Sequence, residues 1–525
     1  MGGATAFLLL APATAPQFVS AAEPAEATPF AVPEATIDSI TAAFAGGNLT
    51  CVELVQAYLD RIEAYDQPDT DELTTNAVQT VSETALQQAA ELDATYAESG
   101  PTGPLHCIPV LVKDQVETAD MPTTYGSAIF EDFTSGRDAT VVADLREAGA
   151  IILAKTNLGE FASGWAGSAF GLCRNPYDLT RSPSSSSCGT GAGVAANYGA
   201  VGIAEDTGGS TRGPAAWNNA VGLRPTTPLI SRFGMIPASP TQDTLGPLTR
   251  TVKDAALVTN VIAGYDPEDP LTAASVGNVE DDYADELSAD ALQGKRIGII
   301  REPMSSDADP TSDSYARVKA VTDQAYADMA ALGAEVIDPI EVPNLNELLD
   351  IAGEGSAETE TAIDAYLADL PNTPVTSFRE IATSPLITPT RRSGLLSALN
   401  RSTDELAYLQ AQQAREQLRQ TVLQVMAEND LDAVAYATFD HEPPVIPDDQ
   451  LVNPEATEDL ISGSNRSLSP MLGFPALAVP AGFTTEQLPV GIDLLGRPFD
   501  EELLFQLAYA YEQGTMHRVA PTPEQ

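Results

Sequence analysis

The most regular pattern along the chain is a helical repeat of apolar residues that begins after Thr50. Val55, Tyr58 and Ile62 recur at the three- and four-residue spacing that places side chains on one face of a helix. Thr50 and Glu53 have the spacing of a capping box, in which each side chain accepts a hydrogen bond from the other residue's backbone N–H. A helix is therefore predicted to start here. Further helices are predicted over residues 141–148, 314–332 and 501–512.

Short apolar runs alternate with these helices and are typical of buried strands. They occupy residues 107–112, 151–154, 294–300, 335–342, 433–437, 476–479 and 490–495. Residues 294–342 follow the order strand, helix, strand, which is that of a βαβ unit. We find no internal repeat. The pattern predicts a layered α/β protein.

The first residues differ in composition from the rest of the chain. Residues 6–11 are apolar and are followed by small residues, which is typical of a secretory signal, although no Lys or Arg precedes them. We expect a signal peptide over 1–22 and a secreted or periplasmic protein. If the segment is not a signal, the protein is expected in the cytoplasm. A lead-in rich in Pro and Ala over 23–34 precedes one expected domain over 35–520, with a mostly helical insertion near 343–420.

The charge of the chain disfavours two classes of partner. Lys and Arg number 26 and Asp and Glu number 75, so the formal charge is −49. Phosphate backbones and anionic lipid surfaces need a cationic face, so nucleic acid is not an expected partner. No later stretch reaches the roughly 18 apolar residues of a membrane span, so none is expected.

Cysteine and histidine are both sparse. The four cysteines are Cys51, Cys107, Cys173 and Cys188, and the three histidines are His106, His441 and His517. No pair of cysteines has the spacing of zinc ligands, and four cysteines in a chain of this length form no disulfide framework. We therefore expect no metal, no cofactor and no disulfide framework, and we interpret Cys188 as a small buried residue.

Two stretches carry chemistry that is unusual for a core or a loop. Residues 182–191 are small and rich in hydroxyl groups, and residues 205–212 contain Gly208 and Gly209 directly before Ser210. Paired glycines let the backbone turn tightly, so that several N–H groups can point at one developing oxyanion beside the serine hydroxyl. Ser210 is therefore a candidate nucleophile.

A serine nucleophile needs a base, because its hydroxyl is a weak nucleophile at neutral pH. The three histidines stand in no suggestive context. Lys113 directly follows the apolar run 108–112, so its side chain is expected to start inside the protein. Burial disfavours the ammonium form of a lysine, and a neutral lysine can serve as the base.

Nine segments occur in an order that has a known counterpart. They are 103–114, 154–161, 175–178, 182–191, 206–212, 221–226, 243–248, 473–476 and 488–491. In this order the chain resembles the amidase signature family of serine hydrolases over residues 35–518. The resemblance implies the fold of that family, an α/β architecture with a central mixed β-sheet covered by helices on both faces.

The resemblance also implies a Ser–cis-Ser–Lys triad. Ser210 falls on the nucleophile, Lys113 on the base, and Ser186 on the bridging serine whose preceding peptide bond is cis in the family. The oxyanion hole would consist of the N–H groups of Thr207, Gly208 and Gly209, with that of Ser210.

The serine run departs from the family pattern by the loss of three glycines, which leaves Ser185 and Ser187 as alternative registers for the bridging serine. We expect Ser187 to form hydrogen bonds within the site. Asp206 and Arg212 are expected to form a charge pair that orders the nucleophile loop, and Lys155 is expected to have a structural role.

The function implied is that of a cofactor-independent amidohydrolase that cleaves linear carboxamides. A preference for esters or aryl-acylamides on the same triad is one alternative, since both pass through an acyl-enzyme. Another is a subunit of a larger assembly, similar to the transamidation subunit that acts on aminoacyl-tRNA. We expect a small-molecule amide substrate, a monomer or homodimer, and an acyl pocket formed near 343–420 and 436–465.

Overall fold

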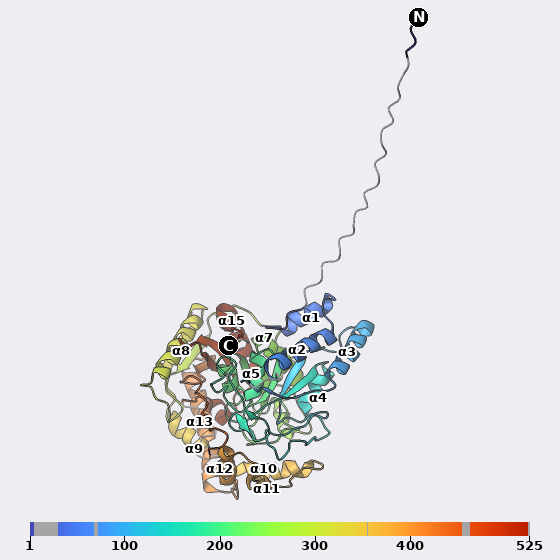
Figure 1. The fold of residues 1–525 in the computed structure, drawn as a ribbon. Coiled ribbons are helices and arrows are strands. Elements are labelled where there is room, and N and C mark those ends of the chain that lie inside the picture. The colour runs from blue at the N-terminus through green and yellow to red at the C-terminus, as the bar shows by residue number, and fades with distance from the viewer. Residues whose placement is uncertain (5–29, 68–71, 354, 454–462, 523–525) are drawn as a thin grey trace.

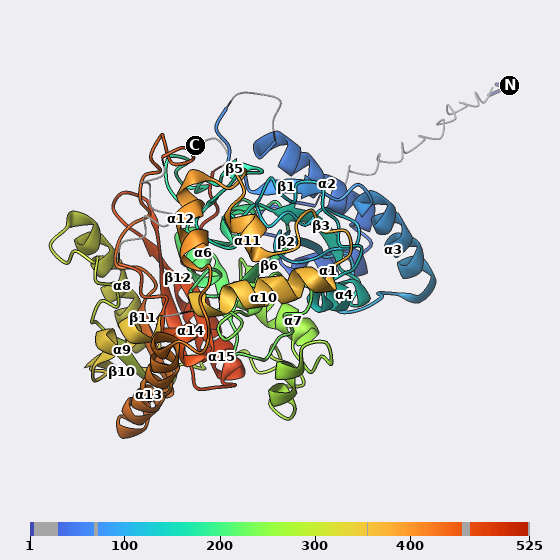
Figure 2. The same ribbon diagram turned by 90° about the horizontal axis from the view of Figure 1, so that it is seen from below.

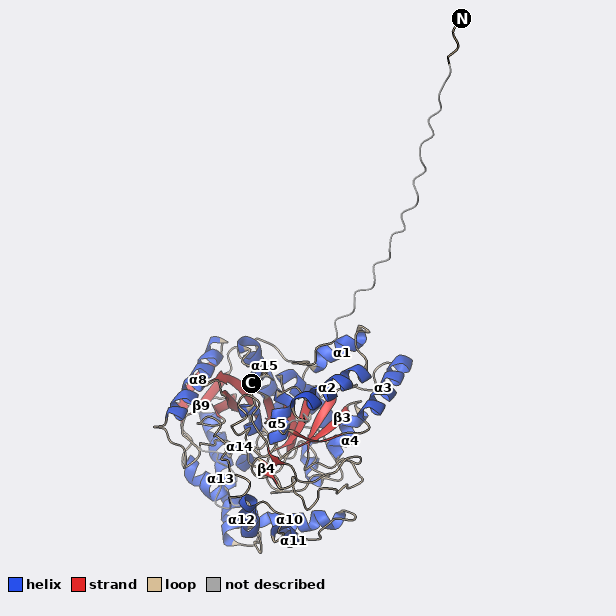
Figure 3. Ribbon diagram, viewed as in Figure 1, coloured by secondary structure: helices blue, strands red, loops and turns tan. Residues whose placement is uncertain are grey.

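The computed structural model shows a layered fold in which strands lie at the centre and helices surround them (Figures 1 and 3). It describes residues 1–4, 30–67, 72–353, 355–453 and 463–522. Almost all of the expected signal peptide and most of the lead-in therefore lie outside the described residues. Within the described ranges, no helix is both long and apolar enough to cross a membrane.

A mixed β-sheet of eleven strands runs through the described part of the chain. Its strands, from one edge to the other, are β1 (Val78–Val81), β3 (Ile151–Thr156), β2 (Pro109–Lys113), β6 (Val201–Glu205), β8 (Leu245–Thr249), β7 (Val221–Arg224), β12 (Ala476–Phe483), β13 (Pro489–Leu495), β11 (Ala433–Ala437), β9 (Arg296–Ile300) and β10 (Glu335–Ile340). Strand β2 pairs in parallel with β3 and β6, and β9 pairs in parallel with β10 and β11. The other neighbours pair antiparallel. A small hairpin joins β4 (Ala166–Gly167) and β5 (Gly171–Leu172).

Helices cover the sheet, as expected for this fold class (Figure 3). They are α1 (Ile37–Ala45), α2 (Cys51–Tyr65), α3 (Ala85–Ser99), α4 (Thr140–Glu147), α5 (Cys188–Ala195), α6 (Arg212–Trp217), α7 (Val252–Ile262), α8 (Asp313–Ala331), α9 (Leu345–Ala352), α10 (Ser356–Asp369), α11 (Phe378–Ala382), α12 (Pro389–Ser397), α13 (Leu406–Glu428), α14 (Leu468–Leu472) and α15 (Glu501–Thr515), with a 3₁₀ helix over Pro270–Ser275.

The predicted local patterns are confirmed where they were strongest. Helix α2 begins after the capping box of Thr50 and Glu53, and its apolar face is buried at Val55, Tyr58 and Ile62. The elements β9, α8 and β10 follow one another as a βαβ unit with parallel strands. These segments have a clear apolar period, and both helices begin at a local cap, so neighbouring residues suffice to predict them.

Helices α10, α11 and α12 form a separate layer at one end of the molecule (Figures 1 and 2). Their apolar residues, among them Ile363, Phe378 and Leu395, pack with Tyr125 and Phe161 in a cluster of their own. Glu160 accepts hydrogen bonds from the backbone N–H and the hydroxyl of Thr388, which precedes α12. This layer therefore rests on loops that follow strands β2 and β3.

The four cysteines form two disulfides, so the expectation drawn from their sparse spacing is wrong. Cys51 pairs with Cys107 across 56 positions, and Cys173 pairs with Cys188 across 15. The α-carbons lie 5.5 and 6.0 Å apart, within the range of ordinary disulfides. The count and spacing of cysteines carry no information on which of them the fold brings together.

Two parallel strands end side by side and determine where polar groups gather. Strand β2 ends at Lys113 and its neighbour β6 ends at Glu205. Strand β8 runs antiparallel to β6 and begins at Leu245, which pairs with Glu205. The start of β8 therefore lies beside the carboxyl ends of β2 and β6. The carboxyl ends of parallel strands are where α/β proteins usually bind ligands.

The Cys173–Cys188 bond allows a test of its contribution to stability. Replacing both cysteines by serine is expected to lower the free energy of unfolding by about 3 kcal/mol, because a crosslink over some 15 residues removes entropy from the unfolded chain. Denaturant titration of the oxidised wild type against the double variant measures the loss. Equal stability of the two proteins would contradict the pairing.

Candidate active site

Lys113 lies at the end of a strand whose five residues are all buried, and its own side chain has no exposed surface. Its Nζ lies 2.8 Å from Ser186 Oγ and 2.9 Å from Glu205 Oε2. The apolar run before it holds the side-chain stem in the core, as the sequence predicts. The amine is thereby placed against a serine hydroxyl and away from bulk water.

Within the serine run, the hydroxyl of Ser186 lies at hydrogen-bond distance from the Lys113 amine. The peptide bond between Ser185 and Ser186 is cis. Ser187 donates from its backbone N–H to the Ser210 carbonyl at 3.4 Å, and its hydroxyl donates to the Glu205 carbonyl at 3.2 Å. The serine run and the nucleophile loop therefore lie side by side, and Ser187 forms hydrogen bonds within the site as expected.

Ser210 lies on the loop between β6 and α6 and is half-buried, whereas Gly208 at the tip of the loop is exposed. Gly209 has a φ of 105°, a region that favours glycine. Its N–H donates to Asp206 Oδ1 at 2.7 Å, so in this structure it does not point toward a substrate. Thr207, Gly208 and Ser210 remain the expected oxyanion donors.

Asp206 and Arg212 form the expected buried ion pair, with Nε 3.1 Å from Oδ2. Arg224 also contacts Asp206, at 3.2 Å, and Asp493 contacts Arg212 at 2.6 Å. Burial alone would raise the pKa of Asp206, but the charges of Arg212 and Arg224 lower it well below its usual range. The carboxylate therefore stays ionised and holds the nucleophile loop through the Gly209 N–H.

Arg466 is a site residue that the sequence did not reveal. Its Nη1 donates to the carbonyls of Ser185 and Gly209, at 3.2 and 3.3 Å. The guanidinium also stacks over the ring of Phe439, 4.7 Å from its centroid. One side chain thus joins the two serine loops, and no sequence pattern around position 466 indicates it.

Glu205 and Asp243 are two further acids beside the lysine that sequence reasoning did not assign to the site. Burial lowers the pKa of Lys113, while the charge of Glu205 and, more weakly, those of Asp206 and Asp243 raise it. Thr207 links the two acids, since its hydroxyl contacts a carboxyl oxygen of Glu205 and lies 2.7 Å from Asp243 Oδ1.

Lys155 is buried as completely as Lys113 but faces other groups. Its Nζ lies 2.9 Å from Asp114 Oδ1 and 2.9 Å from Thr123 Oγ1. Asp114 in turn accepts hydrogen bonds from Thr124. Lys155 therefore holds the loop that follows Lys113, which is the structural role expected of it.

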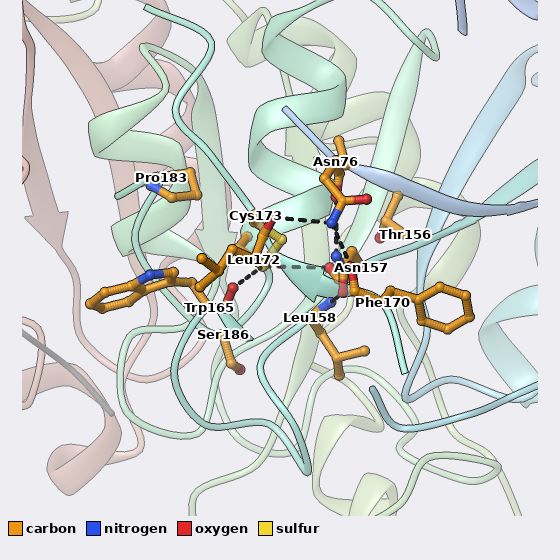
Figure 4. The surroundings of a disulfide bond; sticks show 12 residues. Asn76, Thr156, Asn157, Leu158, Trp165, Phe170, Leu172, Cys173, Pro183 and Ser186 are labelled. Carbon is orange, nitrogen blue, oxygen red and sulfur yellow. Dashed lines mark hydrogen bonds between the residues drawn. A yellow bond between two sulfur atoms is a disulfide. The ribbon is translucent and has the colours of Figure 1, made fainter. Parts of the chain in front are cut away.

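The Cys173–Cys188 disulfide anchors the serine run at the end that leads into α5 (Figure 4). Cys188 stands two positions after Ser186 and begins helix α5, and the N–H of Cys173 donates to the Trp165 carbonyl at 3.0 Å. Asn157 accepts a hydrogen bond from the N–H of Gly189 in the same region. The bond thus ties the start of α5 to the loop around β4 and β5.

Cys51, His106 and Cys107 bring three potential metal ligands within 4.8 Å of one another in the described part of the chain. The two cysteines are joined in a disulfide, so they offer no thiolate to a metal ion.

The amidase family model matches residues 53–505 of this chain. The chain belongs to the amidase family. Among its relatives, a subunit of the glutamyl-tRNA(Gln) amidotransferase of Carboxydothermus hydrogenoformans is 34% identical over 501 residues, which cover 92% of this chain and 98% of that protein. A probable amidase of Arabidopsis thaliana is 32% identical, and the match covers 94% of this chain and 92% of that protein.

Solved structures agree with this assignment. Native peptide amidase from Stenotrophomonas maltophilia superposes with a TM-score of 0.83 at 32% identity, and the match covers 94% of this chain and 99% of that one. The family resemblance and the mixed-sheet fold expected from the sequence are therefore confirmed. This amidase is an enzyme that acts on amide C–N bonds.

Gly209 tests how tightly Arg466 confines the nucleophile loop of this amidase. A Cβ at this position would lie 2.3 Å from Arg466 Cβ, and alanine would also be strained at a φ of 105°. Gly209→Ala is expected to lower kcat/KM by about 100-fold or more, because it displaces the oxyanion donors.

Gly208→Ala is the matched comparison, since its Cβ would meet no atom within 4 Å. It is expected to lose far less activity than Gly209→Ala. Steady-state kinetics on both variants, with thermal unfolding as a check on folding, measure the difference. Equal losses would contradict the confinement by Arg466.

Proposed function

We propose that this amidase hydrolyses linear carboxamides to a carboxylate and ammonia or an amine through an acyl-enzyme on Ser210. The observation that carries the proposal is the contact of the buried Lys113 Nζ with Ser186 Oγ, at 2.8 Å, beside the loop that bears Ser210. A buried amine is the kind of base that a serine relay needs, because desolvation disfavours its protonated form.

In the proposed acylation, Ser210 Oγ attacks the amide carbonyl and gives its proton to Ser186. Ser186 passes its own proton to the lone pair of Lys113 Nζ. The tetrahedral oxyanion is stabilised by the backbone N–H groups of the nucleophile loop. The proton then returns from Lys113 through Ser186 to the departing nitrogen, so that the C–N bond breaks and an ester on Ser210 remains.

Deacylation repeats this path with water as the nucleophile. Water gives one proton to the relay, its oxygen attacks the ester carbonyl, and the proton returns to Ser210 Oγ as the carboxylic acid leaves. The acid then ionises to the carboxylate by releasing its proton to water. These steps use side chains, backbone N–H groups and water, with no cofactor. An ester substrate would pass through the same acyl-enzyme, so matched ester and amide substrates distinguish an esterase or aryl-acylamidase preference.

We place the acyl pocket between the nucleophile loop and the helices of residues 343–420. Arg415 in α13 donates to Gln242 Oε1 at 2.6 Å, and Gln242 Nε2 donates to the Thr207 carbonyl at 3.2 Å. These two bonds connect the helical insertion directly to the loop that carries the oxyanion donors. They support a substrate-lining role for the insertion.

The net charge favours an enzyme that works alone over a subunit that contacts tRNA. Several relatives are named as subunits of a glutamyl-tRNA(Gln) amidotransferase. A formal charge of −49 opposes contact with RNA phosphates, which binding proteins neutralise with Lys and Arg. We therefore propose a monomer or homodimer with a small-molecule amide substrate.

We propose that the protein works outside the cytoplasm, in a secreted or periplasmic setting. The two disulfides support this, because such bonds form and persist mainly in oxidising compartments. The apolar segment at the N-terminus points the same way.

Ser210→Ala is expected to abolish hydrolysis of carboxamides, with a loss of kcat of about 10⁴-fold or more, because no acyl-enzyme can form. Mass mapping of a fluorophosphonate label is expected to find it on Ser210 in the wild type. Ser288→Ala, which alters an exposed serine, is the control and should leave labelling and turnover unchanged. Turnover retained by purified Ser210→Ala would contradict the proposal.

The proposed base also predicts a dependence on pH. Lys113 acts in its neutral form, so kcat/KM should fall as the pH drops through the lysine pKa and should level off above it. Burial lowers that pKa, so activity should persist well below the ordinary lysine value of about 10.4. A pH profile in which activity rises only above that value would contradict a desolvated base.

A further inference from the structure

Glu205 is a buried carboxyl group in direct contact with the proposed base. It is the last residue of β6 and has no exposed surface, and its Oε2 lies 2.9 Å from Lys113 Nζ. An ionised carboxylate at this distance would favour the ammonium form of Lys113, which cannot accept a proton from Ser186. An uncharged Glu205 would therefore leave Lys113 freer to act as the base than an ionised Glu205 would.

The hydrogen bonds of Thr207 supply a reason for Glu205 to be uncharged. The Thr207 hydroxyl contacts Glu205 Oε1 and also lies 2.7 Å from Asp243 Oδ1. A hydroxyl has one proton to donate, so it cannot donate to two carboxylates at once. If both acids were ionised, one contact would join two oxygens with no hydrogen between them. The geometry therefore favours a proton on one of the two carboxyl groups.

The surroundings of the two acids indicate which of them holds it. Asp243 accepts from two backbone N–H groups, that of Ala238 at 2.9 Å and that of Ser239, which lies 2.9 and 3.0 Å from its two oxygens, and such bonds favour an ionised carboxylate. Among the described contacts, Glu205 receives no backbone N–H at its carboxyl group. Burial and a negative charge on Glu205 both act to raise the pKa of Asp243, so the two acids resist being ionised together.

We propose that the hydrogen-bonded series Glu205–Thr207–Asp243 shares a single acidic proton, which resides on Glu205. Glu205 is thereby a positioning residue that keeps Lys113 neutral. The inference rests on the proposed function, since it assumes that Lys113 is the base. Glu205 Oε1–H donates to Thr207 Oγ1, and the Thr207 hydroxyl donates to Asp243.

In this arrangement the two N–H groups and the lone pair of the neutral amine each have a partner, the second N–H facing the Glu205 carbonyl at 3.5 Å. Neutral Lys113 donates one N–H to Glu205 Oε2 and keeps its lone pair for the hydroxyl proton of Ser186. In acylation that proton moves to Nζ and later returns through Ser186 to the leaving nitrogen. The proton on Glu205 stays where it is, so the cycle neither gains nor loses a proton.

The other charges near these groups are compensated among themselves. Asp206 is paired with Arg212 and Arg224, and Arg212 is paired further with Asp493. Beside Asp243, Arg232 is paired with Asp269 at 2.8 Å, and these three residues line a cavity of about 230 Å³. The hydrogen-bonded series therefore borders this cavity at Asp243, and a proton can exchange there with the solvent.

Glu205→Gln is the decisive variant, because glutamine has the shape of the protonated acid. Its amide N–H can donate to Thr207 and its carbonyl can accept from Lys113. We expect Glu205→Gln to keep kcat/KM within about fivefold of the wild type, with the acid limb of the pH profile moved by less than about 0.5 pH unit. An ionised Glu205 would give the opposite result. Its loss would move the acid limb down by more than about one pH unit, since a negative charge would leave Nζ.

Glu205→Met has a similar length but no hydrogen-bonding group, and it is expected to lower kcat/KM by about 100-fold, because the lysine loses its acceptor. Full activity in Glu205→Met would overturn the proposal. Glu501→Gln is the matched control, since Glu501 is a buried acid in α15 that accepts from the N–H of Thr226. Thr226 follows β7, which is three strands away from β2 in the sheet. This control measures how much kcat/KM and the acid limb change when a buried glutamate outside the site is neutralised.

A spectroscopic measurement keeps the test independent of turnover. The infrared difference spectrum of wild type minus Glu205→Gln at neutral pH should contain the C=O stretch of a protonated carboxyl group. Its absence would overturn the inference. If the wild type hydrolyses no carboxamide and Ser210 takes no fluorophosphonate, the proposed function fails, whereas a shifted acid limb in an active Glu205→Gln removes only the role of Glu205.

Discussion

The site depends on the burial of one amine, because a lysine serves as a base only if its charge is disfavoured. Strand β2 holds the stem of Lys113 in the core, so Nζ lies at the carboxyl end of the strand without exposure to water. Desolvation then lowers its pKa, whereas a negative charge on Glu205 would raise it. The balance between these two effects decides whether the amine can accept a proton. The contacts of Glu205 therefore matter as much as the depth of the lysine.

This end of β2 brings together segments that are far apart in the chain. Lys113 comes from β2, Ser186 from the loop before α5, and Ser210 from the loop after β6. Asp206 holds the nucleophile loop through backbone N–H groups, and Arg466 joins it to the serine run through two carbonyls. Ionic and backbone contacts, rather than apolar packing, set the geometry here. Such contacts are directional, so they hold the hydroxyl groups in a defined arrangement.

The sequence was most informative where the information is local. The capping box of α2, the buried runs of β2 and β3, and the paired glycines before Ser210 each express their structure within a few residues. The motif order also indicated the family, which the comparisons confirm. The loss of three glycines of the family pattern from the serine run left the register of the bridging serine open. The structure favours Ser186, because only a folded chain shows which hydroxyl reaches the amine.

Residue types and their order therefore sufficed for the fold class, the family and the choice of Lys113, Ser186 and Ser210 as candidates. Folding alone decided the pairing of the cysteines, the capture of the Gly209 N–H by Asp206, and the placement of Glu205 and Arg466. The physical reason is range. A helix cap or a buried run depends on neighbours along the chain, whereas a disulfide, an ion pair or a shared proton depends on distances in space between segments that no local pattern links.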